Sequence, residues 1–346
     1  MTKYNFPKVD LHLHLDGSFR IKTMYELAKQ RDVTVAGKTL QGYEEWMIKH
    51  SNAKDVNDYL QMFDTPTQVL QDKEALTRIT KELIDDIAAY GVRYAEIRFA
   101  PQLHTLKGMS QEDAVISAIA GLNNGLKGKT DFDANLILCT MRQADYQTNL
   151  ETIVLAEKYC KSKVVAVDMA GPEAFHTGDF YIQLFEEAKK RNLNITIHAG
   201  EACGSSEVEN AIKNLHAQRI GHGIHLNLSM DNIKLIQEKR IGFEFCPTSN
   251  LQTKSLSSYS DVPIKDFLRF GIPVTVNSDN MTCSNTNVLH EFAHLNKVFK
   301  FSKYELSQLL NNSIDISFTD IKTKEKLRKL LSQRIDSFYS EMISDK

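Results

Sequence analysis

Short apolar runs recur along the chain and alternate with longer segments of helical periodicity. The apolar runs are rich in Val, Ile and Phe, which is typical of β-strands, and the longer segments repeat apolar residues every three to four positions. Strands are predicted over residues 9–15, 94–100, 135–141, 164–170, 194–200, 219–224, 241–247 and 273–279. Eight strands alternating with helices favour an α/β fold, a closed parallel (β/α)₈ barrel of the TIM type, over an open sheet.

Two segments depart from a minimal barrel. Roughly residues 19–92, between the first two strands, have a helical pattern and are expected to form a lid insertion over the barrel mouth. Extra helices follow the eighth strand, and one carries an apolar stripe of Leu327, Leu331, Ile335 and Phe338 or Tyr339. Because no repeat or linker divides the chain, residues 1–346 are expected to form a single barrel domain.

Composition and charge exclude several classes of protein. With 42% hydrophobic and 25% charged residues, the 346-residue chain has an ordinary globular composition. A formal net charge of −2 gives no electrostatic reason to expect nucleic acid or an anionic membrane as a partner. The five cysteines show no CxxC pair, and no apolar run resembles a signal peptide or a membrane span. We therefore expect a cytoplasmic protein with reduced thiols.

The first predicted strand has an unusual polar face. In KVDLHLHLDGS, residues Asp10, His12, His14 and Asp16 alternate with leucines. A strand places such residues on one face, which here points into the barrel and rises toward the mouth, where barrel enzymes keep their active sites. Two histidines at this spacing can bind one metal ion, although ordinary hydrogen bonds explain an isolated pair equally well.

The ends of later strands carry the same kinds of residue. The fifth strand ends in HAGE, the sixth contains GHG, and the eighth ends in NSDN. His12, His14, His198 and Asp279 together make an N₃O set suited to zinc, with a position left for water. Glu201 and His222 remain beside this set as titratable groups without a metal ligand role.

These residues suit a metal-assisted hydrolysis. A bound divalent ion lowers the pKa of water from about 15.7 to roughly 7 and so supplies a nucleophile at neutral pH. Glu201 is a candidate proton donor to the leaving group, because a carboxyl in a closed pocket holds its proton. His222 accepts a proton from the attacking water or orients it, and chemistry alone allows the two roles to be exchanged.

The motifs HLHLDGS, DMAGPE, HAGE, GHG and NSDN, in this order and spacing, resemble the adenosine deaminase family, and the similarity covers nearly the whole chain. The resemblance implies a zinc-containing barrel that hydrolyses the 6-amino group of adenosine and 2′-deoxyadenosine, a reaction of purine salvage. The products are inosine or 2′-deoxyinosine and ammonia. The implied partner is therefore a small purine nucleoside.

The resemblance also implies roles for individual residues. One zinc ion per chain is held by His12, His14, His198 and Asp279, while Glu201 protonates purine N1 and His222 serves the attacking water. The implied substrate contacts are Asp16 on the ribose side, the Gly171 N–H at purine N3, Asn280 at N7, His14 beside the nucleoside, and an apolar lid of Tyr59, Leu60 and Phe63.

Asn280 departs from the family pattern, which usually has a second aspartate at this position. An asparagine NH₂ donates to N7 without needing protonation, whereas a carboxylate must first carry a proton. We expect Asn280 to preserve purine binding and to alter affinity or selectivity. Pro172 is a smaller departure, since it removes one N–H and leaves that of Gly171 available.

Alternatives remain on the same scaffold. The nearest is a deaminase of adenine or of another modified adenosine. Adenine deaminases of this family tend to carry Glu where this chain has Asp16, and the lid likewise favours a nucleoside over adenine. A two-metal amidohydrolase usually needs a lysine after the fourth strand, which here ends in DMAG. A non-catalytic nucleoside-binding barrel finds support only in Asn280, and the signature of the polynucleotide deaminases is absent. The roles of Asp10 and Asp168 stay open.

Overall fold

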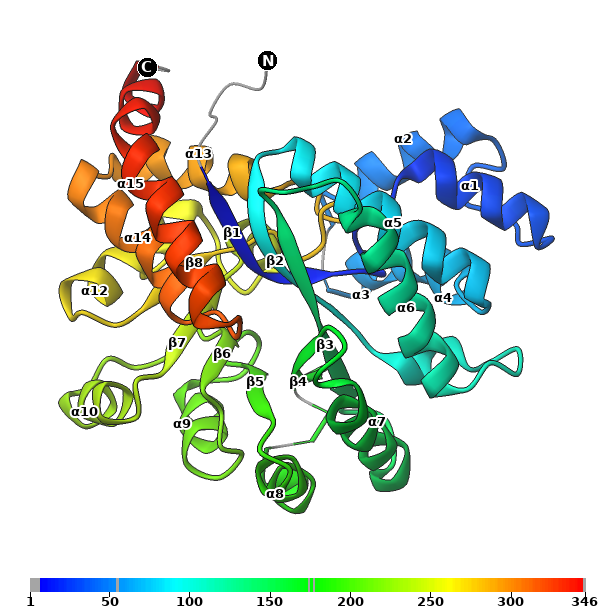
Figure 1. Cartoon of the computed structure of the whole chain (residues 1–346), viewed down its shortest axis with the longest axis horizontal. Helices are drawn as coiled ribbons and strands as arrows, with labels where there is room; N and C mark the ends of the chain where they lie inside the picture. The colour runs from blue at the N-terminus through cyan, green and yellow to red at the C-terminus, as the bar shows by residue number, and fades with distance from the viewer. Residues whose placement is uncertain (1–6, 54–55, 174, 177, 345–346) are drawn as a thin grey trace.

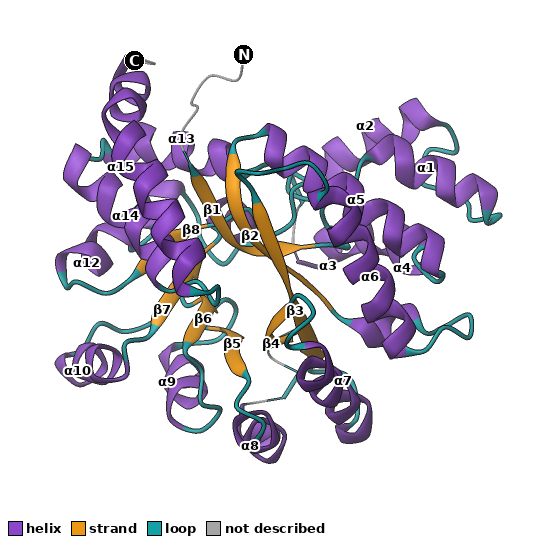
Figure 2. Ribbon diagram, viewed as in Figure 1, coloured by secondary structure: helices purple, strands orange, loops and turns teal. Residues whose placement is uncertain are grey.

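A ring of parallel strands surrounded by helices organises the molecule (Figure 1, Figure 2). The computed structural model describes residues 7–53, 56–173, 175–176 and 178–344. The eight strands pair in chain order, which confirms the predicted barrel. They are β1 (Lys8–His14), β2 (Val92–Phe99), β3 (Asp133–Met141), β4 (Val164–Ala170), β5 (Asn194–Ala199), β6 (Arg219–His222), β7 (Gly242–Phe245) and β8 (Val274–Val276).

The barrel closes where the chain after β8 meets β1. Leu13 and Asp279 form an isolated parallel bridge. The His14 N–H donates to the Asp279 carbonyl, and the Asp279 N–H donates to the His12 carbonyl, each at 2.8 Å. Closure therefore joins the backbones of three predicted metal ligands, and these hydrogen bonds fix their relative height in the barrel.

Helices with well-formed caps cover the outside of the barrel. Asp72, Ser110, Asp145 and Ser229 each accept a backbone N–H at a helix start, which satisfies a donor left free by the first turn. The helices between the strands are α5 (Lys73–Ala89), α6 (Gln111–Leu126), α7 (Tyr146–Tyr159), α8 (Ile182–Lys190), α9 (Ser205–Lys213), α10 (Met230–Lys239), α11 (Pro247–Gln252) and α12 (Ile264–Arg269). Short 3₁₀ turns lie at Pro101–His104, Gly178–Tyr181 and Tyr259–Asp261.

The insertion after β1 is helical, as predicted. It comprises α1 (Ile21–Gln30), α2 (Leu40–His50), α3 (Val56–Leu60), a 3₁₀ turn (Gln61–Phe63) and α4 (Asp64–Val69), and α5 then leads into β2. Figure 1 shows α1, α2 and α4 to one side of the strands. The Tyr59 hydroxyl lies 2.8 Å from Ser284 Oγ, so α3 contacts the loop after β8 on the C-terminal side of the barrel.

The chain ends in α13 (Val288–Phe299), α14 (Lys303–Asp315) and α15 (Ile321–Ser344). The predicted apolar stripe of α15 is confirmed, because Leu327, Leu331 and Phe338 are buried and Ile335 and Tyr339 pack against the core. Among the described residues, no helix combines the length and the apolar character that crossing a membrane requires.

Candidate active site

Three imidazoles and one carboxylate converge at the C-terminal end of the barrel. His14 Nε2 lies 3.2 Å from His198 Nε2. Asp279 Oδ1 lies 3.6 Å from His12 Nε2 and 3.4 Å from His14 Nε2. His12 Nε2 is buried and has no hydrogen-bond partner among the described residues. The four predicted ligands, from β1, β5 and the segment after β8, therefore meet around one point.

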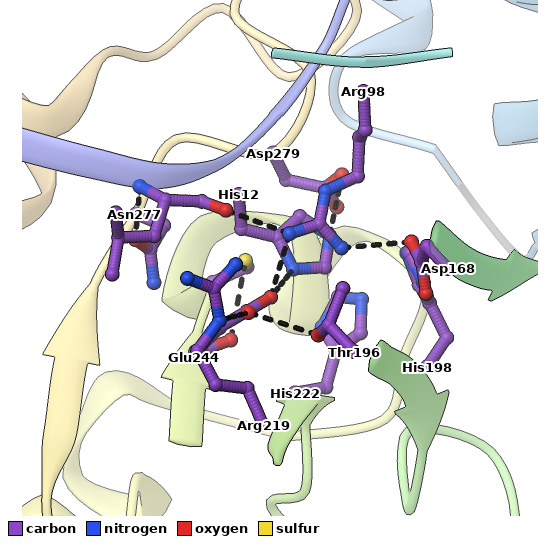
Figure 3. A network of polar contacts seen from close by, with 12 residues as sticks. His12, Arg98, Asp168, Thr196, His198, Arg219, His222, Glu244, Asn277 and Asp279 are labelled. Atoms are coloured by element: carbon purple, nitrogen blue, oxygen red, sulfur yellow. Dashed lines mark hydrogen bonds and ion pairs between the residues drawn. The ribbon is translucent and has the colours of Figure 1, made fainter. Parts of the chain in front are cut away.

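Two buried carboxylates fix the orientation of the ligand rings (Figure 3). His12 Nδ1 lies 2.9 Å from Glu244 Oε2, and His198 Nδ1 lies 2.9 Å from Asp168 Oδ2. A carboxylate accepts a hydrogen bond, so each Nδ1 carries the proton and each Nε2 lone pair faces the common point. Burial lowers the pKa of His12 and His14 well below the ordinary value, which favours the neutral form that binds metals. These donors fit a zinc-type ion.

Two arginines neutralise these carboxylates in the barrel interior. Arg98 lies 2.8 Å from Asp168 and 2.7 Å from Glu244. Arg219 lies 2.6 Å from both Glu244 and Glu96. Burial by itself would raise the pKa of Asp168, but His198 and Arg98 outweigh it and hold that pKa below the usual range. The network keeps the carboxylates ionised, so they remain acceptors for the ligand imidazoles.

Sequence analysis missed most of this network, although a signal was present. Glu96 and Arg98 alternate with apolar residues in RYAEIRFA, and Glu244 interrupts the apolar run IGFEF. Charged residues at alternate positions of a fully buried strand indicate an inward-facing polar network, as they do in β1. The structure also gives Asp168 a role, as the acceptor for His198 Nδ1.

Cys246 lies near the same point and offers an alternative ligand set with His12, His222 and Asp279. Cys246 Sγ donates to the Glu244 carbonyl at 3.6 Å. In the predicted set, by contrast, carboxylates orient two of the histidine rings, so the three histidines and Asp279 are the better candidate metal centre.

Glu201 and His222 lie together beside this centre. His222 Nε2 is 3.7 Å from Glu201 Oε2. Burial lowers the pKa of His222 to about 4 and raises that of Glu201. Asn250 Nδ2 lies 3.0 Å from His222 Nδ1 and donates to it, so a neutral His222 carries its proton on Nε2. From that position His222 donates a hydrogen bond, which favours the orienting role over that of a base.

Positive backbone angles mark two residues of the site. His222 has φ of 62° and Asp279 has φ of 58°, in the left-handed region that side chains other than glycine rarely adopt. The surrounding barrel holds both residues in this costly conformation, and such strain concentrates at functional sites. The two angles turn side chains at strand ends toward the common point.

Three of the predicted substrate contacts, Asp16, Asn280 and Gly171, have distinctive local environments. Asp16 Oδ1 and Asn280 Oδ1 are buried without a hydrogen-bond partner among the described residues. Asn280 Nδ2 donates to Asp279 Oδ1 at 2.8 Å, which leaves its second N–H for a ligand. Gly171 has φ of 96°, and a Cβ there would lie 2.3 Å from Gln143 Oε1, so this position requires glycine.

The three predicted lid residues differ in exposure. Tyr59 is buried and packs edge-on against Phe63, with ring centroids 6.0 Å apart. Phe63 is half-buried, whereas Leu60 is 44% exposed. Leu60 therefore exposes more apolar surface than Tyr59 does.

Asp10 binds the backbone beside the predicted metal ligands. Its Oδ2 accepts from Ser278 Oγ at 2.5 Å, and its Oδ1 accepts from the His12 N–H at 3.4 Å. Asp10 therefore ties β1 to the residue before Asp279, which answers the question that the sequence left open.

A parallel barrel with convergent histidines and an aspartate at its mouth is the architecture of metal-dependent hydrolases. The family model described as "Adenosine deaminase" matches residues 7–334. The chain belongs to the adenosine deaminase family. Relatives include the adenosine deaminases of Haemophilus ducreyi, 43% identical over 94% of this chain and 96% of that protein, and of Clostridium botulinum, 40% identical over 96% and 99%.

Solved structures of related deaminases share the fold. An adenine deaminase from Arthrobacter aurescens has a TM-score of 0.86 and 25% identity, covering 95% of this chain and 99% of its own. The N6-mAMP deaminase of Arabidopsis has a TM-score of 0.83 and 26% identity, covering 95% of this chain and 98% of its own. The same barrel fold therefore occurs in deaminases that are named for different purine substrates.

Proposed function

We propose that this chain hydrolyses the 6-amino group of adenosine and 2′-deoxyadenosine, giving inosine or 2′-deoxyinosine and ammonia, as a single barrel domain that serves purine salvage. The observation that carries the proposal is the convergence of three histidines and Asp279 beside Glu201 and His222. The named relatives at 40% identity or more support the same reaction.

One zinc ion per chain is part of this proposal, held by His12, His14, His198 and Asp279. The buried, unpartnered Nε2 of His12 and the carboxylates behind two of the rings support it. Bound zinc supplies a water whose pKa falls from about 15.7 to roughly 7, which makes hydroxide available at neutral pH.

Glu201 and His222 have the two remaining roles, which are proton donation and orientation of the attacking water. Protonated Glu201, whose pKa burial raises, donates to purine N1 and makes C6 electrophilic. His222 donates from Nε2 and orients the attacking oxygen toward C6. Asn250 Nδ2 lies 3.0 Å from His222 Nδ1 and therefore aligns His222, and it makes a longer contact of 3.5 Å with Glu201 Oε1.

The substrate contacts favour a nucleoside. The unpartnered Asp16 Oδ1 accepts from a ribose hydroxyl, the Gly171 N–H donates to purine N3, and the second N–H of Asn280 donates to N7. Tyr59, Leu60, Phe63 and His14 enclose the nucleoside. Adenine or a modified adenosine is the alternative substrate. The proteins with related structures include an enzyme named for adenine and one named for N6-mAMP, the monophosphate of a modified adenosine.

The absorbance change from adenosine to inosine tests the proposal. Purified protein is assayed with adenosine, 2′-deoxyadenosine, adenine and N6-methyl-AMP, before and after chelation, and after zinc is added back. We expect turnover of the two nucleosides, loss on chelation and recovery with zinc. Activity on adenine without activity on adenosine would refute adenosine as the substrate. Binding of adenosine without turnover would show that the protein is a nucleoside-binding barrel and not an enzyme.

A further inference from the structure

Glu173, the last residue of DMAGPE, is not one of the proposed metal ligands, proton-transfer groups or substrate contacts. We infer that Glu173 is a positioning residue, whose carboxylate fixes the loop that carries Glu201 and joins it to the segment of Gly171. The inference rests on the proposed deamination. In this role Glu173 does not contact the substrate, but it determines the position of the proton donor Glu201.

Four consecutive backbone N–H groups converge on the Glu173 carboxylate. Oε1 accepts from Gly200 at 2.5 Å. Oε2 accepts from Glu201 at 3.1 Å and from Ala202 and Cys203 at 2.8 Å each. The side chain is 7% exposed, so water does not replace these bonds easily. Hydrogen bonds to an ionised acceptor are about twice as strong as neutral ones, so Glu173 fixes this loop firmly.

The loop needs this support because, among the described residues, the contacts of the Glu201 side chain are all long. Its Oε1 lies 3.3 Å from Thr253 Oγ1 and 3.5 Å from Asn250 Nδ2. Its Oε2 lies 3.7 Å from His222 Nε2. Since these contacts hold the carboxyl weakly, its direction depends on the backbone of residues 200–203, and that is the backbone that Glu173 binds.

Glu173 also links the two ends of the purine site. Only Pro172 separates it from Gly171, and the proline ring fixes φ at that position. The N–H proposed for purine N3 and the carboxyl proposed for N1 are therefore held by one short segment. Burial raises the pKa of Glu201, His198 opposes this shift, and the nearby Glu173 carboxylate adds to it as a smaller contribution.

The first test compares E173Q, E173D and the matched control E207Q. Glu207 Oε2 likewise accepts one backbone N–H, from Gly178 at 2.8 Å, outside the proposed site. We expect E173Q to lower kcat for adenosine by about ten-fold or more, with a smaller change in KM and unchanged metal content. E173D keeps the charge and is expected to recover part of the loss, and E207Q to stay within about two-fold.

A double-mutant cycle with E201Q separates positioning from simple stability. If Glu173 acts through Glu201, adding E173Q to E201Q lowers the residual rate little further. A multiplicative loss in the double variant overturns the inference, as does an unchanged kcat in E173Q. If E173Q does not fold, an unchanged kcat in E173D overturns it. A wild-type protein that releases no ammonia from adenosine refutes the proposed function instead.

Discussion

His12 Nδ1 donates to Glu244 Oε2 across 2.9 Å inside the barrel. The same carboxylate accepts from Arg98 at 2.7 Å and from Arg219 at 2.6 Å. One fully buried acid thus orients a proposed metal ligand and compensates two buried guanidinium groups. Metal binding and the stability of the barrel interior therefore depend on the same residue.

Replacing Glu244 with Gln is expected to lower the free energy of unfolding by about 3–5 kcal/mol, because two buried arginines lose a charged partner. Metal affinity should fall by about 10- to 100-fold, since His12 loses its acceptor. Denaturant titration and metal analysis measure both effects.

The control for this substitution is E186Q. Glu186 also pairs with a histidine, His216 at 2.6 Å, but its side chain is 41% exposed. The change in unfolding free energy should stay below about 1 kcal/mol. Equal effects of E244Q and E186Q would contradict the role given to the buried pair.

Replacing Asn250 with Ala is expected to lower kcat by about 10- to 100-fold with little change in metal content. The His222 ring loses the donor that fixes its proton on Nε2, and Glu201 loses a contact. Steady-state kinetics and metal analysis provide the measurement.

N135A is the matched buried asparagine. Asn135 Nδ2 donates to the Tyr94 hydroxyl at 3.0 Å near the start of β3, at the end of the strand opposite the mouth. It should reduce stability by about 1–3 kcal/mol while kcat changes little. A kcat in N250A no lower than in N135A would argue against alignment of His222 by Asn250.

Asn280 is the position where the chain departs from its family pattern. N280A removes the N–H proposed for purine N7, so kcat/KM for adenosine should fall by about 3- to 10-fold. N280D should also change kcat/KM, because it places a second acid beside Asp279 in place of an N–H donor at 2.8 Å. An N280D variant with an unchanged kcat/KM would count against a special role for the amide.

The buried Glu291 of α13 predicts that the stability of the protein depends on pH. Burial raises the pKa of Glu291 from 4.5 to about 7, so the folded protein binds its proton more tightly than the unfolded chain does. The resulting stability is fully present below pH 4.5 and is lost as the pH rises through about 7. The change amounts to at most about 3 kcal/mol.

E291Q tests this dependence. An amide can accept from the Thr248 N–H and donate to Thr286 Oγ1, the two partners of the carboxyl. Urea unfolding at pH 5 and pH 8 should show a smaller difference in the variant than in the wild type. The same difference in both proteins would exclude Glu291 as its source.

The sequence predicted the barrel because strand and helix periodicities differ and alternate eight times. It also predicted the site residues at strand ends, since parallel strands in a barrel bring all their carboxyl ends to one mouth. His12, His14, His198 and Asp279 were thus placed together without knowledge of any distance. The family motifs added the roles of Glu201 and His222.

Only the tertiary structure showed which buried groups orient the predicted metal ligands. Glu244 and Asp168 could pair with any inward-facing cation. The stagger of β1, β2, β4, β5 and β7 around the ring decides that they meet His12, His198 and Arg98.

The contacts between loops were likewise not predictable from the sequence. Glu173 reaches the N–H groups of residues 200–203 because two loops from neighbouring strands fold toward each other. The positive φ of His222 and Asp279 likewise depends on the closed barrel around them. Local pattern therefore determined the strands and the residues at their ends. Contacts between residues distant in the chain determined how those residues are oriented, because such contacts exist only after the ring closes.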